Sequence, residues 1–69
     1  MKTHCWVIKN MKTGKYAIDG DECSGTRQLA HKYDTREKAR LERCYDNERV
    51  LKAYLNSKGR IVRVEDNKH

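Results

Sequence analysis

Alternating apolar and polar residues near both ends of the chain predict two β-hairpins. Residues 3–9 are rich in β-branched and aromatic side chains, residues 10–14 are turn formers, and residues 15–18 alternate again. Gly14 is expected to take the positive φ that such a connection commonly needs. Residues 50–55 and 60–65 predict the second hairpin, because its Asn-Ser-Lys-Gly connection repeats the Asn, Lys and Gly of the first.

A helix is predicted between the hairpins, over residues 34–45. Thr35 can cap its first N–H groups, and Glu37 lies in the first turn, where the helix dipole favours an anion. The narrow buried stripe of this helix follows the i, i+3, i+4 spacing and consists of Leu41, Cys44 and Tyr45. An alternative is that residues 48–55 prolong the helix and Gly59 follows its end.

The segment before this helix predicts a loop. Residues 19–26 are dense in turn formers and carry three acids, but they lack the alternating ligands and closing glutamate of an EF-hand calcium loop. A solvated turn is therefore expected there. Residues 27–33 show no clear period and suit either a short strand or one helical turn.

These elements together predict an α+β fold, with a small antiparallel sheet in the order ββαββ and one helix packed on one face. By the strand period of two, His4, Trp6 and Ile8 share the face that meets the helix. The rest of this single core is expected to come from both hairpins and the helix: Tyr16, Ile18, Leu51, Ala53, Leu55, Val62, Val64, Leu41, Cys44 and Tyr45.

The small size of the chain limits what it can build. Sixty-nine residues, of which 36% are hydrophobic, predict a single domain over 1–69 with a thin core and a frayed tail at 66–69. Large catalytic architectures are excluded. No window approaches the ~18 consecutive apolar residues of a membrane span. We therefore expect a cytoplasmic protein without a membrane partner.

Cys5, Cys23 and Cys44 are odd in number and widely spaced, which is typical of reduced thiols. The alternative is a zinc site that adds His4 or His31 to them. Structural zinc sites usually take their ligands in close pairs, which this chain lacks. Neither a metal nor another cofactor is expected.

Catalytic motifs are also lacking. The sequence contains no nucleophile-elbow, zinc-protease or glycine-rich phosphate-binding pattern. A domain of this length also offers no deep cleft in which a cysteine and a histidine could be kept dry. The protein is therefore predicted to be non-enzymatic.

Positive charge is the strongest functional signal, because 16 Lys and Arg against 10 Asp and Glu give a net charge of +6. If Trp6 and Ile8 face the helix, the opposite sheet face is expected to carry four bases and one aromatic ring: Lys9, Lys15, Lys52, Arg63 and Tyr54. Such a face suits nucleic acid, since its lysines and its arginine can contact phosphates and its tyrosine ring can stack on a nucleobase. The alternative is an ordinary solvated face of a small basic protein.

The predicted helix carries a second group of positively charged side chains. Arg36, Arg40 and Arg43 follow i, i+4, i+7 and form one stripe. A solvated helix face explains it as well as a docking surface for a phosphate backbone or an acidic protein.

Three segments carry a resemblance to a known family: Trp6-Val7-Ile8, Lys12-Thr13-Gly14-Lys15, and residues 33–39 with an aromatic-x-Thr-x-x-x-Ala pattern. In succession, over roughly residues 6–45, they resemble the arm-type DNA-binding domains of phage and transposon integrases. The resemblance implies a small antiparallel sheet that reads the major groove, with Lys9, Lys12, Lys15, Arg27 and Lys32 on or beside its groove-facing strands. The acidic residues at 19–22 depart from that pattern, so the resemblance points to a mobile-element origin more than to specific DNA reading.

Two functional hypotheses follow from the sequence. In the first, the protein binds nucleic acid through its basic sheet face. In the second, it is a small phage-type inhibitor that binds a host nucleic-acid-handling protein, such as a CRISPR, nuclease or polymerase complex, in the host cytoplasm. A homodimer formed through an exposed strand edge is a third prediction.

Overall fold

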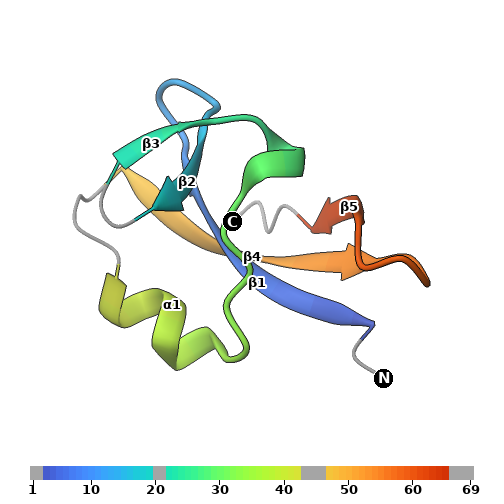
Figure 1. Cartoon of the computed structure of the whole chain (residues 1–69). Coiled ribbons are helices and arrows are strands. Elements are labelled where there is room, and N and C mark those ends of the chain that lie inside the picture. Colours follow the sequence, from blue (N-terminus) through green and yellow to red (C-terminus); the bar gives the residue numbers. More distant parts are fainter. Residues whose placement is uncertain (1–2, 20–21, 43–46, 66–69) are drawn as a thin grey trace.

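The computed structural model describes residues 3–19, 22–42 and 47–65 (Figure 1). Within these ranges the chain forms a five-stranded antiparallel sheet with the spatial order β3-β2-β1-β4-β5. A 3-10 turn, η1 (Arg27–Leu29), and a helix, α1 (Arg36–Glu42), connect the third strand to the fourth. The strands are β1 (His4–Asn10), β2 (Tyr16–Asp19), β3 (Glu22–Gly25), β4 (Glu48–Leu55) and β5 (Ile61–Glu65).

The predicted α+β class, with an antiparallel sheet and one helix, is confirmed. The predicted ββαββ order is wrong by one strand, because β3 forms inside the segment that was expected to be a loop. β3 pairs with β2 through irregular registers that place Gly25 opposite Tyr16. A Cβ atom on Gly25 would overlap the Ile18 side chain, so a glycine permits this close approach.

Both predicted hairpins are confirmed, and their turns are built alike. Asn10 Oδ1 accepts hydrogen bonds from the backbone N–H groups of Lys12 (2.9 Å) and Thr13 (3.2 Å). Asn56 Oδ1 accepts from those of Lys58 (2.9 Å) and Arg60 (2.9 Å). Each turn contains a glycine with positive φ, which is 77° at Gly14 and 78° at Gly59. Residues 50–55 are therefore strand rather than helix.

The helix α1 begins where its cap predicts. Thr35 Oγ1 accepts a hydrogen bond from the Lys38 N–H at 3.2 Å, and the helix starts at the next residue, Arg36. The predicted apolar stripe is wrong at Leu41, whose side chain is 84% exposed. Ala39 is the buried residue of this helix instead. Its small side chain lets the α1 backbone approach the sheet closely. Cys44, Tyr45 and the expected frayed tail at 66–69 lie outside the described residues.

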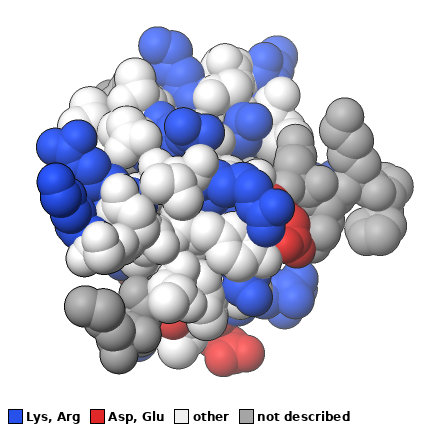
Figure 2. Space-filling view, turned by 90° about the vertical axis from the view of Figure 1, so that its right-hand side faces the viewer, with Lys and Arg blue, Asp and Glu red and all other residues white. Residues whose placement is uncertain are grey.

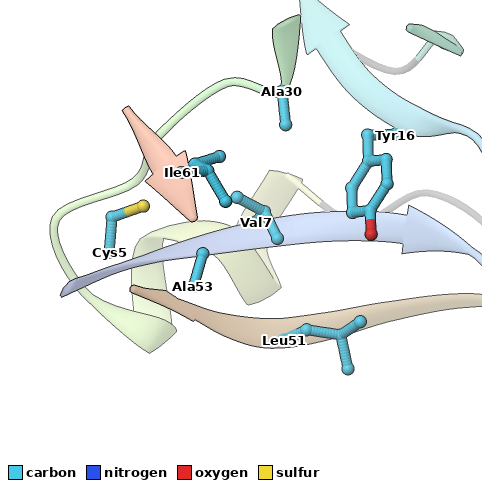
Figure 3. Packing of buried hydrophobic residues seen from close by; sticks show 7 residues of the cluster. All are labelled: Cys5, Val7, Tyr16, Ala30, Leu51, Ala53 and Ile61. Atoms are coloured by element: carbon cyan, nitrogen blue, oxygen red, sulfur yellow. The ribbon is translucent and has the colours of Figure 1, made fainter. Parts of the chain in front are cut away.

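Apolar residues are buried on both sides of the sheet, in two clusters named here after the elements that cover them. The α1-side cluster contains Ile8, Ala17, Tyr33 and Ala39, with Trp6 and Val50 packed against it. The η1-side cluster contains Cys5, Val7, Tyr16, Ala30, Leu51, Ala53 and Ile61. Figure 3 shows the second cluster, in which Ile61 of β5 points toward Val7 of β1.

The predicted single core between sheet and helix is therefore wrong. Tyr16 lies opposite Lys9, and Leu51 lies opposite Val7, so both belong to the η1 side rather than to the side of Trp6 and Ile8. Leu55 and Val64 also pack on the η1 side. Val62, expected in the core, is 53% exposed. The central strand β1 is buried on both sides, which explains its continuous Cys-Trp-Val-Ile run.

Candidate nucleic-acid interface

Strand register determines which of the predicted binding residues share a side of the sheet. Trp6 lies opposite Lys52, and Tyr54 lies opposite both His4 and Arg63. Since directly paired residues project to the same side, Lys52, Tyr54 and Arg63 lie on the α1 side together with Trp6. The prediction that they project from the face opposite Trp6 is therefore wrong.

Among the described residues, the other lysines and arginines that were predicted to bind lie at several separate positions. Lys9 lies on the η1 side, opposite Arg49, and its Nζ is 5.7 Å from the centre of the Tyr16 ring. Lys12 and Lys15 are exposed in the β1–β2 connection, at the opposite end of β1 from His4 (Figure 1). Arg40 is exposed one turn along α1 from Arg36. Arg43 lies outside the described residues.

The structure brings six side chains together on the α1 side of β1, β4 and β5. We call this group the aromatic–basic patch: His4, Trp6, Arg36, Lys52, Tyr54 and Arg63. Arg36 and Arg63 are exposed, so their guanidinium groups reach solvent. The other four side chains are half-buried, so packing restricts the three rings among them.

Backbone pairing on both flanks fixes Trp6 in the patch. On one flank it pairs with Lys52 of β4. On the other flank, its N–H donates to the Tyr33 carbonyl (3.0 Å) and its carbonyl accepts from the Tyr33 N–H (2.9 Å). The segment that follows η1 therefore lies beside β1 at Trp6. Since α1 begins three residues after Tyr33, Arg36 lies next to Trp6.

One cation lies over the Trp6 ring and two lie over the Tyr54 ring among the described residues. The Arg36 guanidinium lies 5.9 Å from the centre of the Trp6 ring. At Tyr54, the Arg63 guanidinium lies at 4.5 Å and Lys52 Nζ at 5.4 Å from the ring centre. These distances are in the range of cation–π contacts. His4 meets Trp6 edge to face, with ring centres 6.3 Å apart.

The acidic residue Glu65 borders the patch. The Tyr54 hydroxyl donates a hydrogen bond of 2.6 Å to Glu65 Oε2, and Glu65 lies opposite Lys52 in the strand register. The hydrogen bond fixes the orientation of the tyrosine ring. The Glu65 carboxylate also lowers the positive potential beside Lys52 and Arg63.

Lys and Arg side chains are widely spread on the side of the molecule where β5 lies. Figure 2 shows them in several separate groups across that surface, whereas acidic side chains of the described residues occupy few places on it. Charge alone therefore does not single out one site. The combination of cations with half-buried rings distinguishes the patch, since Lys9 with Tyr16 is the comparable pair on the η1 side and Tyr16 is buried there.

His4 and Trp6 are the patch residues that the sequence analysis assigned to the core instead. Period-two alternation correctly places them on one side of β1, the side of the helix. It does not indicate how far α1 extends over that side. Both side chains are half-buried, so the described residues do not bury them completely.

The alternative zinc site gains no support from the described side chains. Cys5 is buried on the η1 side, whereas His4 lies on the α1 side. The side chain of Cys23 and all of Cys44 lie outside the description. Among the side chains that are described, no group of three or more His, Cys, Asp and Glu residues is arranged to hold a metal ion.

No helix in the described part of the chain has the length and apolar character needed to cross a bilayer. Comparisons with models of protein families, with curated proteins and with solved structures found no match. The resemblance to arm-type domains of integrases therefore stays a prediction.

Proposed function

We propose that this protein is a non-enzymatic nucleic-acid-binding protein and that the aromatic–basic patch is its binding surface. The observation that supports the proposal is the grouping of two half-buried rings with three cations on one side of adjacent strands. Arginine guanidinium groups match phosphate oxygens in two-pronged hydrogen bonds, and half-buried rings offer contact area at little entropic cost.

The net charge of +6 supports the same proposal, because it acts on nucleic acid over a long range. A net positive charge attracts a polyanion and accelerates encounter, while the patch supplies the close contacts. Binding of this kind releases counterions from the nucleic acid, so affinity falls linearly with salt on a log–log plot.

The test is a salt titration of binding to labelled oligonucleotides, with two double variants compared at each salt concentration. Lys52→Gln with Arg63→Gln removes two cations from the patch. Lys9→Gln with Arg49→Gln removes an equal charge from the opposite side of the neighbouring strands. The patch variant is expected to lose most affinity and to lower the salt slope by about 2 units, since each phosphate contact contributes about 1.

The control variant is expected to bind more weakly only through its reduced net charge. Equal losses in the two variants, with both folded, would contradict the assignment of the patch. Absence of binding by the wild-type protein at low salt would contradict nucleic-acid binding as a whole. In that case, a pull-down in which one host protein is retained after nuclease treatment would favour the inhibitor hypothesis.

A further inference from the structure

We infer that the patch is selective for single-stranded nucleic acid, which deepens the proposed function and rests on it. The patch repeats one arrangement, an aromatic ring with a guanidinium group over it. Arg36 lies over the Trp6 ring, and Arg63 lies over the Tyr54 ring. A nucleic-acid strand is itself a repeat of a flat base and an anionic phosphate. The two ring–guanidinium units therefore match two nucleotides of one strand.

The strand positions that carry the two rings favour bases that are not stacked on each other. Since His4 lies opposite Tyr54, Trp6 is a diagonal neighbour of Tyr54 across the two strands. The backbone positions of such neighbours lie about 7–8 Å apart, more than the 3.4 Å rise per nucleotide of a stacked strand. Bases that contact both rings must have separated from one another, which a flexible single strand permits and a duplex resists.

The shape of the surrounding surface opposes the duplex further. The major groove of B-DNA, about 12 Å wide, admits a helix or a two-stranded ribbon. Here the patch lies within a five-stranded sheet of the described residues, whose outer strands are about 19 Å apart at ~4.8 Å per strand. The helix α1 also rises from the same side, beside Trp6. The sheet as a whole is wider than the groove, and the paired bases of a duplex present their edges rather than their faces to the two rings.

Trp6 provides a direct readout, because it is the single tryptophan of the chain and lies in the patch. The experiment titrates the protein with oligothymidylate, with oligouridylate and with a mixed-sequence DNA duplex, each about 12 nucleotides or base pairs long. Affinity and Trp6 fluorescence are recorded together. Both single strands are expected to bind about tenfold more tightly than the duplex and to quench Trp6 fluorescence by stacking.

Two variants of Tyr54 separate ring stacking from the loss of its hydroxyl group. Tyr54→Leu removes the ring and is expected to weaken single-strand binding about tenfold, with little effect on the duplex. Tyr54→Phe keeps the ring and loses the hydrogen bond to Glu65, and it is expected to bind single strands more tightly than Tyr54→Leu does. Far-ultraviolet circular dichroism checks that both variants are folded.

The outcomes distinguish this inference from the proposed function. Duplex binding as tight as single-strand binding, or single-strand binding that leaves Trp6 fluorescence unchanged, would overturn the selectivity while nucleic-acid binding stands. Absence of binding to every oligonucleotide at low salt would overturn both.

Discussion

Residues that are adjacent in the central strands β1 and β4 lie on opposite sides of the sheet, and the two sides differ in how deeply these side chains are buried. Leu51 and Lys52 are adjacent in β4, yet Leu51 is buried in the η1-side cluster and Lys52 belongs to the aromatic–basic patch. In β1, likewise, Val7 is buried in the η1-side cluster and its neighbour Trp6 lies on the α1 side, in the patch. Buried clusters on both sides stabilise the fold. On the α1 side, the sheet also carries the half-buried rings of the patch, which we propose to be the binding surface.

The largest expected effect comes from breaking the η1 side. Leu51→Ala is expected to lower the free energy of unfolding by about 2–5 kcal/mol, because it leaves a cavity beside Val7 and Ile61. A domain this small has a few kcal/mol of stability, so the variant is expected to be largely unfolded. Chemical denaturation followed by circular dichroism measures the loss.

The matched change on the α1 side is Lys52→Ala, which is expected to alter stability by less than about 1 kcal/mol. A loss there as large as that of Leu51→Ala would contradict the division between the two sides.

The next largest effect is expected where β2 and β3 approach most closely. Gly25→Ala places a methyl group against the Ile18 side chain and is expected to lower the free energy of unfolding by about 1–3 kcal/mol. The double variant with Ile18→Ala removes the overlapping atoms. Its destabilisation, measured by thermal unfolding, is expected to be smaller than the sum of the two single changes. Strict additivity would show that the contact is absent.

A smaller effect is expected at the cap of the helix that covers the α1 side. Thr35→Ala removes the acceptor for the Lys38 N–H and is expected to lower the free energy of unfolding by about 1 kcal/mol. Thr13 provides the control, because its Oγ1 accepts from the Lys15 N–H (3.3 Å) in an exposed turn. Thr13→Ala is expected to lower stability by only a few tenths of a kcal/mol. The reverse ranking in urea titrations would mean that the α1 cap contributes little.

The smallest effect is expected in the opposite direction, as a gain of binding. Glu65→Gln keeps an oxygen that can accept from the Tyr54 hydroxyl but removes the negative charge beside Lys52. Affinity for oligonucleotides is expected to rise by about two- to fivefold at low salt and less at high salt, since exposed charges interact by about 1 kcal/mol or less. Unchanged affinity would place the bound phosphates away from Glu65.

Local chemistry made part of this architecture predictable from the sequence. Asn10 with Gly14, Asn56 with Gly59, and Thr35 each act within a few residues of themselves, so their turns and cap could be predicted without knowledge of the fold. The side of the sheet on which Tyr16 lies depends on its pairing with Lys9 across the first turn. The predicted connection of residues 10–14 pairs Lys9 with Lys15, one residue away from the observed pairing, and a shift of one residue moves every side chain of a strand to the other side.

The same cause explains why the candidate site was only partly predicted. Lys52, Tyr54 and Arg63 were correctly grouped, because they alternate along one predicted hairpin. Their position relative to Trp6 depends on the pairing of β4 with β1, which brings together residues more than 40 positions apart. Leu41 is exposed for a related reason, because α1 packs on the sheet through Ala39 instead.

The central claim, that binding occurs on the α1 side of the sheet, is tested most directly by side-chain nuclear magnetic resonance during titration with an oligonucleotide. The account predicts shifts of the Trp6 indole N–H and of the Tyr54 ring and Arg63 side-chain signals, with the methyl groups of Val7, Leu51 and Ile61 unmoved. Shifts confined to Lys9, Arg49 and the β1–β2 connection, with the Trp6 indole unchanged, would contradict it.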